Sequence, residues 1–205
     1  MYLLAPRLIL RYVNRLKPLK SETALYKSLA CEQQTVRKAK VDARAFRPLY
    51  EKYYKPVFLF LLHRTGDKEL TADLTSQVFL KALAGLHKYE FRGVPFSSWL
   101  YRIAVNECNS FFRKNKAVRL VVLEDHHADR VYEEMFGESS EEDLKRMLPY
   151  ILEKLKPSEL HVIELRYLEG RPFKEVAEIL NISETHAKVK TYRILDKMKK
   201  LFIRK

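Results

Sequence analysis

Hydrophobic residues recur every three or four positions through most of the chain. The period is clear in five stretches, which cover residues 46–61, 70–86, 100–104, 144–155 and 160–167. This spacing places the apolar side chains on one face of an α-helix. No run alternates between apolar and polar residues for long enough to indicate a β-strand. The pattern therefore predicts an all-α fold.

Glycine and proline mark the ends of these predicted helices. Gly66-Asp67 separates the first two stretches, and the segment 92–95 (Arg-Gly-Val-Pro) precedes the third. Gly170 and Pro172 stand in the order in which one helix usually stops and the next begins. With 47% hydrophobic residues, the chain has enough apolar material for a folded core.

The last quarter of the chain carries a helix-turn-helix pattern. Residues 173–180 have the spacing of a short helix. Asn181 follows at a sharp turn, and asparagine tolerates a left-handed backbone better than most residues. Ser183 suits the N-cap of a second helix, and Glu184 suits its positive N-terminal end. Two helices joined in this way typically place the second one in the major groove of DNA.

The second helix of this pattern has two different faces. At 100° per residue, the buried face contains Ala187, Thr191, Ile194, Met198 and Leu201. The outward face and its flanks carry the residues that we expect to contact duplex DNA: Thr185, His186, Lys188, Val189, Lys190, Tyr192 and Arg193. Among these, Arg193 has the donor geometry for two hydrogen bonds to a guanine edge.

Residues 86–116 combine aromatic with basic side chains. Unstacked bases bind to aromatic faces beside cations, so the composition favours a surface for single-stranded nucleic acid. The alternative is that the rings fill a small helical core. The residues of this candidate surface are Lys88, Phe91, Arg92, Phe96, Trp99, Arg102 and Arg113.

Charge is distributed unevenly along the chain. The net charge of +13 indicates an anionic partner, nucleic acid before a membrane surface. Residues 117–143 nevertheless hold nine acidic and two basic residues, a net charge of −7. This connector is either a solvated, extended linker or a tether in a positively charged groove of a partner. The predicted division is a basic extension (1–42), a first domain (43–116), the acidic linker (117–143) and a second domain (144–205).

Nothing in the sequence predicts a catalytic or metal site. Cys31 and Cys108 lie far apart without zinc-binding spacing, and we expect them to be reduced thiols in the cytoplasm. Ser97 and Ser98 lack a neighbouring base. The longest apolar run, residues 57–62, is too short to span a membrane. We therefore expect no enzyme activity, cofactor, small-molecule substrate or stable membrane insertion.

Two blocks of the chain closely resemble conserved regions of the sigma-70 family. Asp73-Leu74, Phe91-Arg92-Gly93 and the segment 96–106 resemble the family's second region. Residues 165–170, together with the helix-turn-helix, resemble its fourth region. A short chain with only these two blocks is similar to the extracytoplasmic-function (group IV) sigma factors.

This resemblance implies a promoter-specificity subunit of bacterial RNA polymerase. Its second domain would read the −35 duplex and contact the polymerase flap, and the connector would follow the RNA path. Asn106 and the loop before Phe96 would hold a flipped base of the −10 element, with Trp99 and Arg102 supporting that helix. An anti-sigma factor is an expected partner. The residues implied in binding the polymerase clamp are Asp73, Leu74, Gln77 and Phe79.

Two alternatives remain open at this point, together with one departure from the family. A helix-turn-helix regulator that binds duplex DNA without polymerase would explain the second block only. A DNA-processing enzyme of the resolvase kind would need a nucleophile or metal-binding carboxylates in the first block. The departure is the long extension 1–42, where Arg7, Arg11 and Arg15 share one face of a possible helix. The extension is either an arm directed at DNA or a membrane, or a disordered tail or misassigned start.

Overall fold

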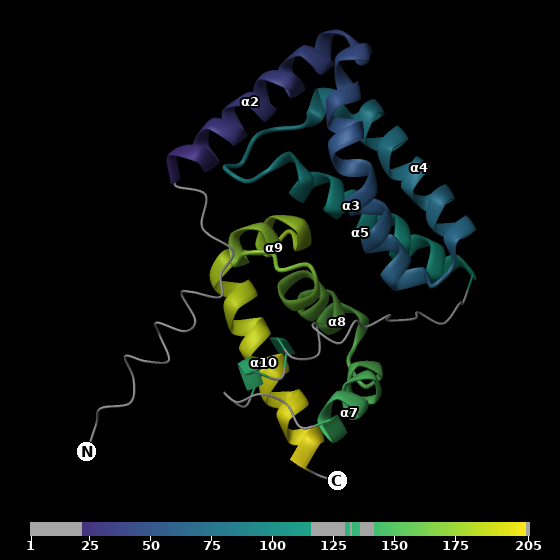
Figure 1. Cartoon of the computed structure of the whole chain (residues 1–205), viewed down its shortest axis with the longest axis vertical. Helices are drawn as coiled ribbons and strands as arrows, with labels where there is room; N and C mark the ends of the chain where they lie inside the picture. Colours follow the sequence, from purple (N-terminus) through teal and green to yellow (C-terminus); the bar gives the residue numbers. More distant parts are fainter. Residues whose placement is uncertain (1–21, 116–129, 132, 136–141, 204–205) are drawn as a thin grey trace.

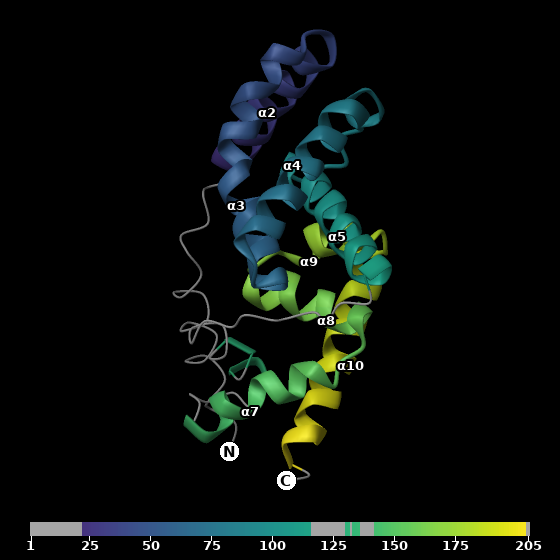
Figure 2. The ribbon, with the colours of Figure 1, turned by 90° about the vertical axis from the view of Figure 1, so that its right-hand side faces the viewer.

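The computed structural model describes residues 22–115, 130–131, 133–135 and 142–203. Every regular element in these ranges is a helix, so the predicted all-α fold is confirmed. Figures 1 and 2 show two groups of helices that lie against each other, with α2–α5 in one group and α7–α10 in the other. None of the described helices is long and apolar enough to cross a membrane.

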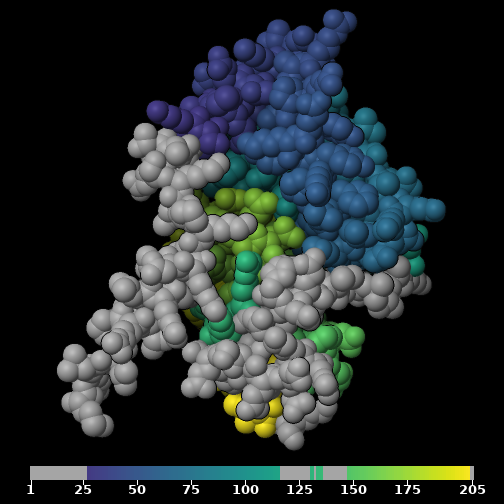
Figure 3. Space-filling view, in the orientation of Figure 1, coloured from purple at the N-terminus to yellow at the C-terminus, as the bar shows by residue number. Residues whose placement is uncertain are grey.

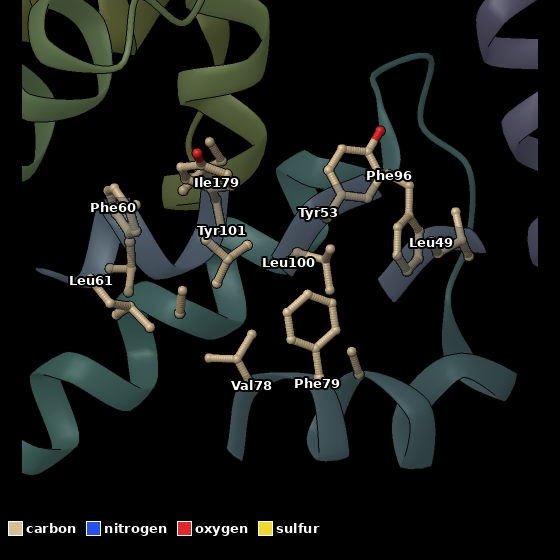
Figure 4. Packing of buried hydrophobic residues seen from close by; sticks show 14 of the residues in the cluster. Leu49, Tyr53, Phe60, Leu61, Val78, Phe79, Phe96, Leu100, Tyr101 and Ile179 are labelled. Carbon is tan, nitrogen blue, oxygen red and sulfur yellow. The ribbon is translucent and has the colours of Figure 1, made fainter. Parts of the chain in front are cut away.

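The first group is built around a core of aromatic and aliphatic side chains (Figure 4). Its elements are α2 (Glu22–Val41), η1 (Ala43–Phe46), α3 (Arg47–Thr65), α4 (Lys68–Gly85), η2 (Leu86–Lys88) and α5 (Phe96–Asn115). The ring of Phe96 lies at the centre, with ring centroids 6.3 Å from Phe46 and 5.1 Å from Tyr89. Edge-to-face ring pairs of this kind stabilise a core beyond the area that they bury.

The predicted break at Gly66-Asp67 has a clear local cause. Gly66 adopts a left-handed backbone with φ of 67° and donates its N–H to the carbonyl of Leu62, which ends α3. The Asp67 carboxylate then accepts hydrogen bonds from the N–H groups of Glu69 and Leu70, at 2.8 and 3.1 Å, and starts α4. One glycine and one aspartate therefore turn the chain between two packed helices.

The N-terminal extension contains a helix that sequence analysis did not predict. An unstructured tail is wrong for residues 22–41, which form α2. Val36 and Ala39 of this helix are buried in the core of the first group. The proposed arm carrying Arg7, Arg11 and Arg15 lies outside the described residues.

The second group contains the predicted helix-turn-helix. Its elements are α7 (Glu142–Glu153), α8 (Pro157–Ile163), the π-helix η3 (Glu164–Leu168), α9 (Phe173–Leu180) and α10 (Glu184–Ile203). Asn181 has the expected left-handed backbone, with φ of 55° and ψ of 48°. Ser183 Oγ accepts a hydrogen bond from the N–H of His186 at 3.1 Å, which confirms the predicted cap. The predicted inner face of α10 is also confirmed, with four residues buried (Ala187, Thr191, Ile194, Met198) and Leu201 partly buried.

Part of the acidic connector packs against the second group. Residues 130–131 and 133–135 are helical, and the side chains of Val131 and Met135 are buried in that group's core. Lys199 on α10 donates a hydrogen bond to the carbonyl of Met135 at 3.0 Å. An extended, solvated linker is therefore wrong for this part, because two apolar residues among the acidic ones give it a face to bury.

The two groups share an interface that includes a buried ion pair. Arg64 near the end of α3 donates to Glu164 Oε2 of η3 at 2.6 Å, and the Arg64 side chain is only 1% exposed. Its guanidinium also lies 3.9 Å from the centroid of the Phe60 ring. Figure 3 shows the second group in contact with the underside of the first, and Figure 4 shows Ile179 of α9 beside Tyr101 of α5.

Removing one member of this pair should be strongly destabilising. We expect Arg64→Met to lower the free energy of unfolding by about 3–5 kcal/mol, because the buried Glu164 carboxylate would lose the guanidinium that pairs with it. The double variant Arg64→Met, Glu164→Leu should recover most of that loss. Urea denaturation of both variants and of the exposed control Lys55→Met measures the effect. Equal stability of Arg64→Met and the control would contradict a structural role of the pair.

Candidate nucleic-acid and partner interfaces

The outward face of α10 presents the side chains predicted to contact duplex DNA. Six of them are exposed and Lys190 is partly buried: Thr185, His186, Lys188, Val189, Tyr192 and Arg193 are the exposed ones. Val189 is 41% exposed and Tyr192 is 52% exposed, so both side chains are accessible to a ligand on this face. Since the opposite face of α10 is buried, the helix is held with this face directed to solvent.

Cations on this face are available to an anionic ligand. Lys188 pairs with Glu184 one turn earlier at 2.8 Å, on the exposed surface. Among the residues that the structure describes, neither Lys190 nor Arg193 forms an ion pair. Glu159 of α8 lies beside them, but its carboxylate accepts from Lys197 at 2.7 Å. Burial acts to raise the pKa of Glu159, yet the hydrogen bonds from Lys197 and from the Lys156 N–H lower it overall.

The candidate strand surface of the first group is partly open. Five of its predicted residues are exposed: Lys88, Phe91, Arg92, Asn106 and Arg113. Arg102 and Asn106 stand four residues apart on α5 and therefore share one face of the helix. The exposed set distributes an amide, an aromatic ring and several cations along α5 and the loop before it.

Other predicted members of this surface are structural. Phe96 is 1% exposed, so its ring has no face on which a base could stack. Trp99 is half-buried, with its ring centroid 5.2 Å from Tyr89 and 5.4 Å from Phe96. These two rings support the start of α5 from inside, which is the core-filling alternative raised by the sequence.

Helix α9 covers the remaining part of the candidate strand surface. Arg102 donates hydrogen bonds to the backbone carbonyl of Glu178 and, at 2.5 Å, to its carboxylate Oε1. Arg92 lies 3.8 Å from the same carboxylate. Ser98 of α5 donates to Glu175 Oε2 at 3.3 Å. Arg92 and Arg102, which the sequence predicts to bind a nucleic-acid strand, are therefore paired with an acidic face of α9.

A second layer of polar contacts joins α5 to the loop before α9. Arg171 lies 4.1 Å from the centroid of the Tyr101 ring and donates to Glu175 at 3.0 Å and to Ser97 Oγ at 3.2 Å. Tyr101 donates its hydroxyl to Glu169 Oε2 at 3.1 Å. Burial raises the pKa of Glu169 above its usual value, although the charge of Arg171 opposes this. These polar contacts lie beside apolar ones, because Val176 and Ile179 of α9 are buried in the same cluster as Tyr101 of α5.

Helix α4 carries the residues implied in contacting polymerase. Asp73 and Gln77 are exposed, whereas Leu74 and Phe79 are buried, so the latter two hold α4 in the core and present no side-chain surface to a partner. Leu80 is 66% exposed and lies one turn beyond Gln77 on the same stripe as Asp73. The surface formed by Asp73, Gln77 and Leu80 is called the α4 stripe below.

Sequence reasoning missed two contributors to these surfaces. Leu80 was left out of the residues implied in binding the clamp, although an apolar residue seven positions after Asp73 lies on the same helix face. Glu178 was missed because its importance depends on Arg92 and Arg102, more than 70 positions earlier in the chain. Across the described ranges, no group of three or more potential ligands is arranged to hold a metal ion.

Two family profiles match the chain, and together they span more than half of it. The profile of Sigma-70 region 2 matches residues 49–118, and the profile of Sigma-70, region 4 matches residues 151–200. The first match therefore contains α4, α5 and the loop that connects η2 to α5. The second match contains the helix-turn-helix.

Curated relatives and solved structures agree with these matches. The ECF RNA polymerase sigma factor SigM of Bacillus subtilis is 28% identical over 157 residues, which cover 76% of this chain and 94% of SigM. The sigma factor BldN of Streptomyces coelicolor is 30% identical over 78% of this chain and 61% of BldN.

Two solved structures share the fold. The alignment with CnrH, solved with the cytosolic domain of CnrY, covers 84% of this chain and 97% of CnrH, with a TM-score of 0.56 at 19% identity. RpoE of Bartonella quintana, solved with the anti-sigma factor NepR, covers 77% of this chain and 96% of RpoE with a TM-score of 0.51 at 20% identity.

Proposed function

Because the chain belongs to the sigma-70 family, and within it to the extracytoplasmic-function sigma factors, we propose that it directs bacterial RNA polymerase to promoters. In this role it binds core polymerase, recognises the −35 and −10 elements and promotes opening of the DNA. The observation that carries the proposal is the pairing of an outward-facing DNA helix, α10, with the amide, aromatic and cationic surface around α5. A regulator that binds duplex DNA alone has no use for the second surface.

We assign the steps of initiation to separate surfaces. The α4 stripe binds the polymerase clamp through an apolar side chain rimmed by polar ones, and the second group contacts the flap. The face of α10 reads the −35 duplex, where Arg193 contacts a guanine edge and Lys188 and Lys190 contact phosphates. Asn106, Phe91 and the cations around them hold an unstacked −10 base, which costs a few kcal/mol to flip out.

The acidic linker and the further partners follow from the same role. The negative charge of the linker suits a positively charged path on polymerase. An anti-sigma factor is the partner expected to inhibit the free protein. The protein acts in the bacterial cytoplasm, where polymerase works. It needs no catalytic residue and no cofactor of its own, because polymerase supplies the chemistry.

Purification with core polymerase tests the proposed function directly. The full chain should copurify with core RNA polymerase, and the resulting holoenzyme should give run-off transcripts from a subset of a promoter library. Tight and specific binding of the isolated chain to duplex promoter DNA, without any association with polymerase, would instead support the regulator.

The contact between α9 and α5 indicates how the free protein is kept from promoter strands. Glu178 takes the place of a backbone phosphate against Arg92 and Arg102, so a −10 strand and α9 compete for the same cations. We propose that polymerase separates the two groups, and that the isolated protein binds single-stranded −10 DNA poorly for this reason.

Neutralising Glu178 should weaken this competition. We expect Glu178→Gln to raise the affinity of the isolated full chain for a −10 single strand by about tenfold, since a hydrogen bond to a charged group contributes roughly 1.5–3 kcal/mol. Fluorescence anisotropy measures the affinity. Glu153→Gln, an exposed residue at the end of α7, changes net charge equally and serves as the control. An equal gain in both variants would show a general charge effect and contradict the competition.

Removing Arg193 should relax sequence choice at the −35 element. With holoenzyme containing Arg193→Ala, discrimination at one base pair should fall by about 1–3 kcal/mol, because a bidentate contact to guanine is lost. Binding to a set of single-base −35 variants measures this. Lys200→Ala, exposed near the other end of α10, is the matched control. Uniform weakening across all variants would make Arg193 a phosphate contact.

A further inference from the structure

Helix α2 lies outside the segments matched by the family profiles, yet its side chains are hydrogen-bonded to both ends of the loop that precedes α5. This loop runs from Glu90 to Pro95 and separates η2 from α5. Under the proposed function it carries residues that meet the −10 base. The way in which α2 holds this loop therefore bears on base selection.

The end of the loop is fixed by a buried carboxylate. Glu32 of α2 accepts a hydrogen bond from the backbone N–H of Phe96 at 2.6 Å through Oε2. Its other oxygen accepts from the Tyr53 hydroxyl and from Lys52 Nζ, the latter at 2.9 Å. Since the Glu32 side chain is only 6% exposed, these donors replace water around the charge. The carboxylate thus satisfies an N–H at the start of α5 that no intrahelical acceptor can reach.

The beginning of the loop is fixed by the same helix. Lys40 Nζ, two turns after Glu32, donates to the backbone carbonyl of Tyr89 at 2.6 Å. The Tyr89 side chain is buried, and burial raises the pKa of its hydroxyl to about 12. Both ends of the six-residue loop are therefore hydrogen-bonded to α2, through side chains that lie eight residues apart.

Packing leaves only a short tip of the loop exposed, and Arg92 of this tip pairs with Glu178 of α9. Val94 is buried, and Gly93 takes a left-handed backbone with φ of 71° to return the chain to the core. Glu90, Phe91 and Arg92 are exposed. A tip of three exposed residues on two fixed ends is preorganised, and preorganisation lowers the entropy lost when a ligand binds.

We propose that α2 holds both ends of this loop in place, with Glu32 and Lys40 as positioning residues for recognition of the −10 base. This inference rests on the proposed function. It adds that selection at the −10 element depends on a helix that is hydrogen-bonded to both ends of the loop. The hydrogen bonds from Lys40 and to Glu32 at the two loop ends thereby fix the positions of Phe91 and Arg92 at the tip.

The test compares base discrimination by holoenzymes that differ only in α2. Lys40→Met keeps the aliphatic stem and removes the donor, while Lys38→Met makes the same change at another exposed position of α2. Glu32→Gln removes the charge at the other end of the loop. Binding to fork-junction DNA with each base at the flipped −10 position gives a ratio between the best and the worst base. Lys40→Arg, which retains a donor, tests for rescue.

We expect the ratio to fall about two- to tenfold in Lys40→Met and Glu32→Gln, the range that corresponds to the net contribution of one hydrogen bond. It should stay unchanged in Lys38→Met and be largely restored in Lys40→Arg. Affinity for the −35 duplex should stay unchanged in all four. An unchanged ratio in both Lys40→Met and Glu32→Gln, or an equal fall in Lys38→Met, would overturn the inference. If the unmodified holoenzyme shows no −10 base preference, the proposed function itself fails, which is a distinguishable result.

Discussion

The contact of α5 with α9 is the interaction on which the rest of this structure depends. α5 is the central helix of the first group, and its outer side faces the loop and helix that begin the helix-turn-helix. Arg102, Tyr101 and Ser98 on that side are all hydrogen-bonded to glutamates of the second group. The buried pair of Arg64 and Glu164 extends the same interface to the end of α3. Two units that must bind separate promoter elements are thereby held as one body.

An interface that combines these polar contacts with a shared apolar cluster can be both specific and reversible. The arginines and glutamates of this interface pair with one another, which offsets part of the cost of burying them. When the groups separate, the same arginines and glutamates return to water or bind a new ligand. DNA phosphates offer Arg92 and Arg102 the negative charge that Glu178 supplies in the closed form. The interface therefore couples the exposure of the α5 surface to the separation of the two groups.

The sequence predicted local features well and long-range features poorly. The helical periods, the cap at Ser183 and the left-handed turn at Asn181 follow from neighbouring residues, and the structure has all of them. The helix α2 was missed because its buried residues are few and interrupted by polar ones, among them Glu32, whose partners lie 20 to 64 positions away. The burial of Arg64 was equally hidden, because an arginine before a helix-ending glycine looks like a solvated charge near the helix dipole. The candidate surfaces could be located by residue type, but which rings line them and which fill the core depended on packing, as Phe96 and Phe91 illustrate.

The distance between the two groups in solution decides whether α9 covers α5 in the free protein. Spin labels would be attached at cysteines that replace Lys55 on α3 and Lys200 on α10, two exposed positions. The exposed Cys31 would be replaced by serine, and pulsed electron paramagnetic resonance would measure the distance between the labels. We expect one short, narrow distance distribution for the isolated protein and a clearly longer one in the promoter-bound holoenzyme. A distribution for the isolated protein that is already as long as in the holoenzyme would contradict this expectation, since α9 would then not cover α5 in the free state.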